Sequence, residues 1–555
     1  MSQDTATAEH DTTDGEAEED GGPAFLLSVE QNEYLPAAAG RAEMHAIVRV
    51  EARGLGRAAA RAAACEVIVI DCSSSMSWPA PKMRAARKAT VAAVEALREG
   101  TRFAVVRGTE RAEVVYPPTG GVAVAGPDTK AAAARAATRL TPVGGTAIGA
   151  WLDLARRLHT GQPAPLRHTL LLTDGKNEHD EPGHLDRVLD ECAPCFSCDA
   201  RGIGDDWDAV ELKEIVRRLR GRADAVLDVS DLPAEFEAMA RGSMARALTG
   251  VRIRVRTRAG GAVGMVKQVY PTRVDLTAEG VRPDERTWEW TTGPWGDEVR
   301  EYHLCVLADP EGDAQDEEIE LAEVALSPAE DTGACAEGAG EGRDGGEGGD
   351  GGQGGGGGQG GGGAGSGEGA GGGGGAGGAG GVRMPAARSV LVRWTDDPLL
   401  SSRIHPRLAH YGTDDALGLA VTAAYDAYVA GEPRQALAHW GRAVRLAHEL
   451  GNGKMLDRLR GLVDIVDAAA GEVRLRERIR PLDLNSAMVL SEESSRYRGA
   501  GQAAAAPAAS PAPLAPAPAP ADIECPDCAR LAPAGAAFCQ QCGTPFGPDT
   551  PAGAV

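Results

Sequence analysis

Hydrophobic and polar positions change their period several times along the chain. Residues 24–53 alternate apolar and polar side chains, which predicts two β-strands. From about residue 62 to residue 245, short apolar runs alternate with amphipathic helical patterns. That order predicts a mainly parallel sheet wrapped by helices. Strand patterns return at 250–327 and once more at 388–394.

The strand-rich segments lie on both sides of the α/β segment. The simplest arrangement is a β-sandwich built from residues 23–55, 250–330 and 388–400. An α/β domain at 62–245 would then be an insertion between two sandwich strands. The sequence therefore predicts two closely connected domains in the first 400 residues.

Residues 411–480 are predicted to be helical, in at least two amphipathic stretches. Gly431 and Pro433 separate two of them, because glycine and proline interrupt a helix. The pair resembles one tetratricopeptide-like helical hairpin.

Three low-complexity segments are predicted to have no folded core. Residues 1–22 are an acidic tail, residues 333–382 consist almost entirely of Gly, Ala and acidic residues, and residues 500–522 are a Pro/Ala linker. The last of these connects a short cysteine-containing segment, residues 523–547, to the rest of the chain.

Composition narrows the classes of function. The chain has 555 residues, which suggests roughly three to four structural units, and a formal charge of -24. This charge argues against a general nucleic-acid or membrane-surface binder. No apolar stretch approaches the roughly 20 residues of a membrane span, and the acidic N-terminus lacks the features of a signal peptide. We therefore expect a cytoplasmic protein; the sequence gives no oligomeric state.

Oxygen-bearing side chains follow three of the predicted strands and loops of the α/β domain. The run VIVID ends at Asp71, and Ser73 and Ser75 come two and four residues later. The loop TPVGGTAIG presents Thr146, and the strand of LLLTDG ends at Asp174. Ligands of open α/β sheets bind at the carboxyl ends of the strands, so these five side chains are expected to converge.

The ordered motifs D-x-S-x-S, G-G-T and T-D-G closely resemble the metal-ion-dependent adhesion site of von Willebrand factor type A domains. The resemblance covers roughly residues 62–245, with Ser74 where glycine is common. It implies a doubly wound, Rossmann-like fold and a Mg²⁺ or Mn²⁺ ion. Ser73, Ser75 and Thr146 would hold the ion, with Asp71 and Asp174 acting directly or through water. A site of mostly neutral hydroxyls leaves the ion electrophilic, so an acidic residue of a protein partner can complete its coordination.

Three other interpretations of these residues remain open. Asp71 and Asp174 could simply cap helices and end strands, with the serines as ordinary loop hydroxyls. Asp71 could be the nucleophile of a phosphohydrolase, although the expected second carboxylate two residues later is Ser73. The chain could also be a subunit of an ATP-driven chelatase-type machine, but it contains no nucleotide-binding G-x-x-x-x-G-K-[ST] motif.

Cysteines near the C-terminus have the spacing of a metal site. Cys525, Cys528, Cys539 and Cys542 form two C-x-x-C pairs, which suit a tetrahedral Zn²⁺ ion and resemble a zinc ribbon. The only basic residue between them is Arg530, so we expect the ribbon to contact protein rather than nucleic acid.

Other residues have weaker claims to a function. Cys192, Cys195 and Cys198 could hold a metal, but no fourth ligand is evident. His179 follows Asp174 and is expected either to influence the choice of partner or to be solvated. Trp295 lies in a strand connection and is either exposed or packed at the sandwich edge.

Together these observations predict a non-enzymatic adaptor with a magnesium adhesion site and a tethered zinc ribbon. The segments VEQNEYL, WGDEVREYHL and VRWTDDPLLSSRI look like those of actinobacterial proteins of this type, a resemblance that implies a setting in Ser/Thr kinase and phosphatase signalling. We further expect Asp71→Ala to abolish partner binding and leave the fold intact, because a hydrated surface site contributes little to a core.

Overall fold

The structure is a computed structural model that describes most of the chain outside the low-complexity segments. Residues 1–497 form one compact unit and residues 498–555 a second. Among the described residues, no helix combines the length and apolar character that a membrane span needs. The described residues are 22–37, 40–79, 81–329 and 381–498, with the backbone of 523–524 and 531–532.

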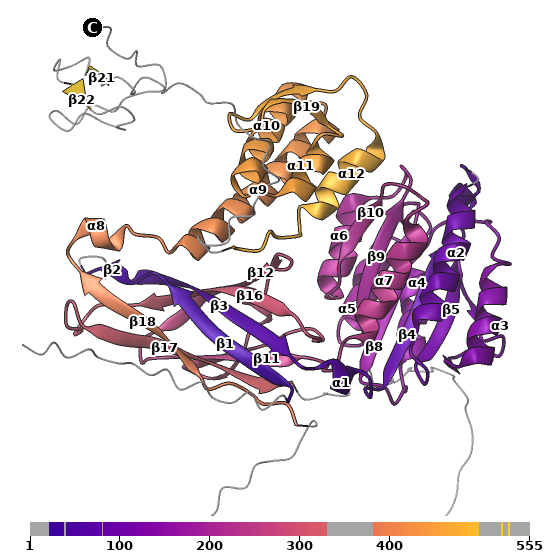
Figure 1. Cartoon of the computed structure of the whole chain (residues 1–555), viewed down its shortest axis with the longest axis horizontal. Helices are drawn as coiled ribbons and strands as arrows, with labels where there is room; N and C mark the ends of the chain where they lie inside the picture. The colour runs from indigo at the N-terminus through magenta and orange to yellow at the C-terminus, as the bar shows by residue number, and fades with distance from the viewer. Residues whose placement is uncertain are drawn as a thin grey trace, which may run out of the picture. The chain divides into compact units, whose positions relative to one another are not determined.

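A seven-stranded sheet forms the centre of the α/β domain (Figure 1). Its strands are β4 (Ala64–Asp71), β5 (Arg102–Gly108), β6 (Ala112–Tyr116), β7 (Ala123–Val124), β8 (Leu166–Thr173), β9 (Ser197–Ile203) and β10 (Ala223–Val226). Strands β10, β9, β8, β4 and β5 run parallel in that order, whereas β6 and β7 pair antiparallel with β5. Every residue of β4 is buried, as expected of a parallel strand covered on both faces.

Helices cover both faces of this sheet, which confirms the predicted mixed α/β domain (Figure 1). One face packs against α2 (Pro81–Ala96), α3 (Pro127–Ala137) and α7 (Leu232–Met244). The other packs against α4 (Ile148–His159), α5 (His184–Cys192) and α6 (Ala209–Arg218). Two short helices complete the domain: α1 (Gly56–Ala59) and the 3-10 helix η1 (Ser74–Ser77).

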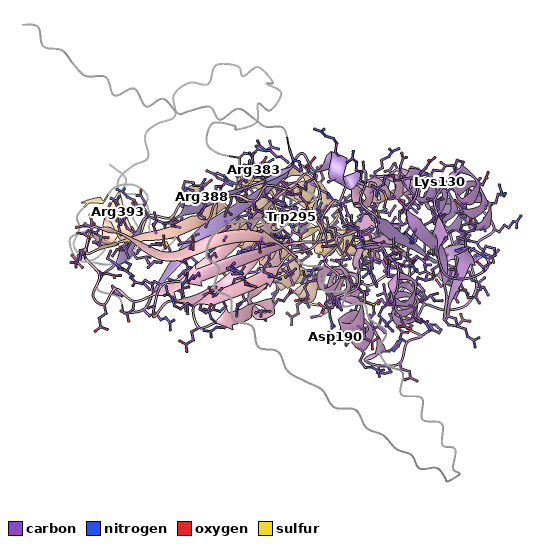
Figure 2. The ribbon with its side chains drawn as sticks, turned by 90° about the horizontal axis from the view of Figure 1, so that it is seen from below. Lys130, Asp190, Trp295, Arg383, Arg388 and Arg393 are labelled. Carbon is purple, nitrogen blue, oxygen red and sulfur yellow. The ribbon has the colours of Figure 1, made fainter. Side chains whose placement is uncertain are left out.

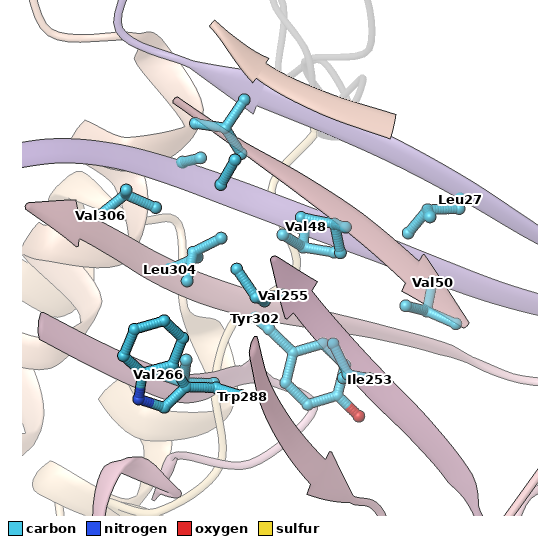
Figure 3. Close-up of a cluster of buried hydrophobic side chains, with 14 of the residues drawn as sticks. Leu27, Val48, Val50, Ile253, Val255, Val266, Trp288, Tyr302, Leu304 and Val306 are labelled. Atoms are coloured by element: carbon cyan, nitrogen blue, oxygen red, sulfur yellow. The ribbon is translucent and has the colours of Figure 1, made fainter. Parts of the chain in front are cut away.

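Two further sheets pack on one hydrophobic core, part of which is drawn in Figure 3. The five-stranded sheet contains β1 (Ala24–Gln31), β3 (Ala42–Arg53), β16 (Val299–Ala308), β12 (Ala262–Tyr270) and β13 (Val274–Asp275). The six-stranded sheet contains β14 (Val281–Asp284), β15 (Thr287–Thr291), β11 (Val251–Thr257), β17 (Glu318–Pro328), β18 (Arg388–Thr395) and β2 (Tyr34–Pro36). The 3-10 helix η2 (Thr277–Glu279) precedes β14.

Strands from both sides of the α/β domain build these two sheets. Residues such as Val48, Val255 and Tyr302 come from distant parts of the chain and meet in the shared core (Figure 3). Residues 34–36, which the sequence pattern does not predict as a separate strand, pair in parallel with β18. The α/β domain is therefore continuous in sequence, whereas the two sheets around it are not.

Trp295, whose position is labelled in Figure 2, is fully buried in this core, so it is packed rather than exposed. Its indole Nε1 donates to the Thr292 hydroxyl at 2.7 Å, and the guanidinium of Arg300 lies 4.1 Å from the ring centroid. A tryptophan needs such a partner for its N–H when it is buried.

The helical region consists of α8 (Pro398–Ser401), α9 (Pro406–Val429), α10 (Pro433–Glu449), α11 (Gly453–Leu459) and α12 (Pro481–Leu490). Helices α9 and α10 pack on each other through residues such as Val421 and Trp440. The prediction of a helical region at 411–480 needs one correction, because β19 (Val463–Asp467) and β20 (Glu472–Leu475) form an antiparallel hairpin within it. Gly471, with φ +72°, shapes its turn, and the Asp467 carboxylate accepts two backbone N–H groups there.

This region contacts both of the other parts of the first unit. Leu408 and Tyr411 of α9 pack on Ile47 and Val269, on the outer face of the five-stranded sheet. Leu482, Met488 and Val489 of α12 belong to a core of the α/β domain, and the Asn485 amide donates to the Trp207 carbonyl at 2.6 Å. The second unit has only two short described strands, β21 (Ile523–Glu524) and β22 (Leu531–Ala532), which pair antiparallel.

Candidate metal site

The predicted site residues meet at the carboxyl ends of β4 and β8. These strands are parallel neighbours, and the register pairs Ile70 with Leu172. Asp71 ends β4 and Asp174 follows β8, so the two carboxylates lie side by side. Strand β4 lies between β5, the next strand in the chain, and β8, so the strand order reverses at β4. In open α/β sheets such a reversal leaves a crevice where ligands bind.

The Asp71 carboxylate is fully buried and organises the loops around it. One oxygen accepts the Ser73 N–H at 2.8 Å, and the other accepts the Thr173 hydroxyl at 2.9 Å and the Asp174 N–H at 3.1 Å. The expectation that Asp71→Ala leaves the fold intact is therefore not supported by the geometry. Each buried donor left without a partner costs about 1–3 kcal/mol.

The hydroxyls converge on Asp174. Ser73 Oγ and Ser75 Oγ are 2.8 Å apart, and they lie 3.3 and 2.6 Å from Asp174 Oδ1. Thr146 arrives from a different loop: a Cβ placed on Gly175 would lie 3.0 Å from Thr146 Oγ1 and 3.8 Å from Ser75 Oγ. The structure thus brings together all five residues predicted from the sequence.

A buried lysine, which the sequence analysis did not identify, completes the cluster. Lys82 Nζ lies 2.8 Å from Asp174 Oδ2, and the two side chains are 5% and 0% exposed. The lysine comes from the first turn of α2 and passes Gly204, where a Cβ would lie 2.7 Å from Nζ. The only sequence signal is a cation on the apolar face of a helix that follows the serine loop.

Without a further cation, the buried carboxylates of Asp71 and Asp174 repel each other. Burial and the neighbouring charge of Asp174 raise the pKa of Asp71 to about 6, against the hydrogen bonds that it accepts. Two carboxylates and one ammonium leave a net charge of about -1 when all are ionised. A bound cation would offset this charge.

The loop that carries Thr146 is held from two directions. The Gly145 N–H donates to Glu110 Oε2 at 2.9 Å. Gly144 has φ +83°, and a Cβ at this position would lie only 1.8 Å from the same carboxylate oxygen. The Nδ1 atom of His179 accepts the Thr146 N–H at 3.2 Å, and the backbone N–H of His179 donates to the Thr146 carbonyl at 3.0 Å. His179 therefore positions the loop, a role beyond the partner-tuning or solvated roles expected from the sequence.

Replacing His179 with alanine is expected to weaken Mg²⁺ binding by about tenfold, because Thr146 loses the acceptor that orients it. Calorimetric titration of the full chain with Mg²⁺ measures the change. Glu178→Ala, an exposed substitution in the same loop, is the matched control and should leave the affinity unchanged. Equal affinities for the two variants would mean that the His179 side chain does not position Thr146.

The donor set fits a small, hard cation. Mg²⁺ and Mn²⁺ prefer oxygen ligands, and the site offers hydroxyl and carboxylate oxygens with few protein anions. The predicted zinc ligands Cys525, Cys528, Cys539 and Cys542 lie outside the described residues. Cys192 and Cys198 are buried in the α/β core.

Comparison with known proteins agrees with this architecture. The family model for the von Willebrand factor type A domain matches residues 67–225. A solved structure from Catenulispora acidiphila, described as von Willebrand factor type A, is 33% identical, with a TM-score of 0.70; the alignment covers 86% of this chain and 98% of that one. The ArnB paralog VWA2 from Sulfolobus acidocaldarius is 12% identical, with a TM-score of 0.48 and coverage of 84% and 98%.

A curated relative is an uncharacterized protein from Synechocystis sp. It is 27% identical over 223 residues, which are 38% of this chain and 50% of the relative. The chain thus matches about half the length of that relative.

Proposed function

Because this chain belongs to the von Willebrand factor type A family, whose domains are protein-interaction modules, we propose that it binds an acidic residue of a protein partner through a divalent cation. Mg²⁺ or Mn²⁺ would be held by Ser73, Ser75 and Thr146, with Asp71 and Asp174 direct or water-mediated. The observation that carries this proposal is the convergence of three hydroxyls and the Asp174 carboxylate at one edge of the sheet.

An acidic ligand follows from the charge of this donor set. Hydroxyl ligands withdraw little charge from a divalent cation, so the ion stays electrophilic, and Mg²⁺ keeps some water ligands that a partner can replace. The neighbouring surface carries the exposed Glu110 carboxylate beside the loop of Thr146, which repels an acidic partner when no ion is bound. Binding should therefore depend on the ion.

The rim of the site supports a protein ligand rather than a small ion alone. Trp78, which directly follows η1, is 80% exposed, and Val143, in the loop before Thr146, is 51% exposed. Exposed aromatic side chains next to a polar centre are typical of residues that contribute strongly to protein interfaces. Together they supply apolar contact area around the ion.

A catalytic role for Asp71 is less well supported. A phosphohydrolase nucleophile must reach its substrate, whereas both Asp71 oxygens accept protein hydrogen bonds and the residue is fully buried. We therefore propose a non-enzymatic adaptor, with service as a subunit of an ATP-driven machine as the second candidate. The cytoplasmic location and a setting in kinase and phosphatase signalling stay predictions from the sequence.

The proposed adaptor also has a zinc ribbon formed by the four C-terminal cysteines. Two C-x-x-C pairs at this spacing suit tetrahedral Zn²⁺. The short ladder between β21 and β22, immediately before Cys525 and between the two pairs, is consistent with such a ribbon.

Replacing Ser75 with alanine is expected to weaken Mn²⁺ binding to the full chain by about tenfold or more, because one ligand oxygen is lost. Free Mn²⁺ is measured by its electron paramagnetic resonance signal during titration. Ser77→Ala is the matched control: Ser77 lies in the same 3-10 helix, but its hydroxyl donates to the Ser74 carbonyl.

The same two variants test the partner. Immobilised wild type and Ser77→Ala should retain, in Mg²⁺, a protein that Ser75→Ala does not, and neutralising the acidic residues of that protein should abolish its retention. Equal Mn²⁺ affinity in the two variants would refute the metal site. An altered Mn²⁺ affinity without any difference in retained proteins would refute the adhesion role.

A further inference from the structure

A second group of metal-type ligands lies on the outer face of the five-stranded sheet. Residues that point inward from β3, such as Met44 and Ala46, belong to the sandwich core, so Glu43 and His45 face outward. Cys305 of β16 is the direct cross-strand partner of His45. Residues opposite each other in an antiparallel pair have neighbouring side chains on the same face.

The three side chains are close enough to share one ion. One ligand atom from each of Glu43, His45 and Cys305 lies within 4.8 Å of the others. Glu43 Oε2 is 3.5 Å from His45 Nε2. Among the described residues, no other group of three or more His, Cys, Asp and Glu side chains meets this distance.

A fourth residue orients the histidine. His45 Nδ1 lies 3.1 Å from His303 Nε2, and His303 is on the same outward face, two residues before Cys305. In the tautomer in which His45 Nδ1 donates to His303, the His45 Nε2 lone pair faces the Glu43 carboxylate. Two acceptors then face each other, an arrangement that a cation between them satisfies. Metal-bound histidines are commonly oriented by such a hydrogen bond from the other ring nitrogen.

The neighbouring strand leaves room beside the thiol. The ladder between β12 and β16 shifts register between Val263 and Met265, around Gly264. A Cβ on Gly264 would lie 3.4 Å from Cys305 Sγ and 3.2 Å from Leu307. Bulges of this kind are frequent next to functional sites, where they redirect a strand.

We propose that Glu43, His45 and Cys305 form a binding site for a zinc-class divalent cation, with His303 as a positioning residue. A thiolate, an imidazole and a carboxylate are the three ligand types of zinc, and a water molecule would complete the tetrahedron. The thiolate and imidazole favour zinc over magnesium. The thiolate and carboxylate balance the two charges of the ion. None of its residues belongs to the proposed adhesion site or to the C-terminal group of cysteines.

The test is a zinc titration of the full chain against a chromophoric chelator. Serine at all four of Cys525, Cys528, Cys539 and Cys542 removes the thiolates of the C-terminal segment, and excess Mg²⁺ competes with zinc for the proposed site at Asp71 and Asp174. In this background we expect one zinc ion per chain. Cys305→Ser, His45→Gln and Glu43→Gln should each weaken binding by about tenfold or more. Glu51→Gln, on the same strand but outside the group, is the matched control.

A second measurement identifies the ligand directly. Cobalt(II) bound to this background should give a thiolate-to-metal charge-transfer band that is absent in Cys305→Ser. His303→Phe should keep the band but weaken binding by about 10–100-fold. If Cys305→Ser and His45→Gln both bind zinc as tightly as the background protein that carries the serine substitutions of the C-terminal cysteines, the proposal is overturned. Glu43 and His45 would then form only an ordinary ion pair. His45→Gln keeps the test decisive if Cys305→Ser fails to fold, because the His45 side chain is 33% exposed.

Discussion

Replacing His168 with leucine is expected to lower the free energy of unfolding by about 3–5 kcal/mol, since it breaks a buried charge network. His168 Nδ1 lies 2.7 Å from Glu66 Oε1, and Nε2 lies 3.1 Å from Asp199 Oδ2. The Glu66 side chain is fully buried and that of His168 only 5% exposed. Without the imidazolium, two carboxylates remain inside the α/β domain with too little positive charge. Thermal and denaturant unfolding of the full chain measure the loss.

The matched control is His159→Leu. His159 is also buried, its Nε2 lies 3.1 Å from the Thr169 hydroxyl, and no described carboxylate forms a hydrogen bond or ion pair with it. Burial, followed by the charge of Arg167, lowers the pKa of His159 to about 3, so the ring is neutral. Its replacement should cost only about 1 kcal/mol, the net value of a neutral hydrogen bond. Equal losses for the two variants would contradict the charge network.

The same network predicts a pH dependence. Burial alone lowers the pKa of His168, but the charge of Glu66 and the hydrogen bonds to both carboxylates raise it overall. A raised pKa in the folded state means that this stabilisation is complete below the unfolded value of about 6.5 and is lost as pH rises through the folded pKa. As the pH rises above about 6.5, the free energy of unfolding should therefore fall more steeply for wild type than for His168→Leu.

Replacing Lys82 with methionine is expected to make the stability of the α/β domain strongly dependent on Mg²⁺. Without the ion, the buried Asp174 carboxylate loses its cation, and unfolding should become easier by about 3–5 kcal/mol. With Mg²⁺ at about 100 times its dissociation constant, binding restores about 2.7 kcal/mol. Because the competing ammonium is gone, Mg²⁺ should also bind more tightly than it does to wild type. Unfolding midpoints with and without added Mg²⁺ measure both effects without a chelator.

Lys88→Met is the control for this variant. Lys88 lies on the same helix and is exposed, so its replacement should change neither the stability nor the Mg²⁺ response. A Lys82→Met protein that is destabilised equally with and without Mg²⁺ would show that the lysine is structural and that no cation takes its place. A Mg²⁺-dependent loss of stability would indicate a site where Mg²⁺ can replace the lysine ammonium. A loss that does not depend on Mg²⁺ would indicate a permanent ion pair.

The five oxygen-bearing residues of the candidate site could be predicted from the sequence because each follows a strand or a glycine loop in a recognisable order. Lys82 and His179 could not, since neither belongs to a strand end. Lys82 reaches Asp174 only because Gly204, far away in sequence, has no side chain. His179 acts through the backbone of Thr146, which only the folded loops bring near.

The fold shows the same limit at short elements. The long apolar runs of β4 and β8 are identifiable from their pattern alone. The five-residue β19 and four-residue β20 lie between helices and are too short to establish a period of two. The burial of Trp295 depends on residues from distant strands, so the local pattern left its packing open.

The pairing of β2 with β18 has a consequence for synthesis on the ribosome. Leu35 lies beside Trp394, so this ladder can form only after nearly 400 residues have been made. All strands of the α/β sheet fall between Ala64 and Val226 and can pair much earlier. The inserted domain should therefore fold while its host sheets still await their last strand, leaving β1 to β3 exposed to chaperones and proteases. This high contact order makes late truncations more damaging to the host than to the insert.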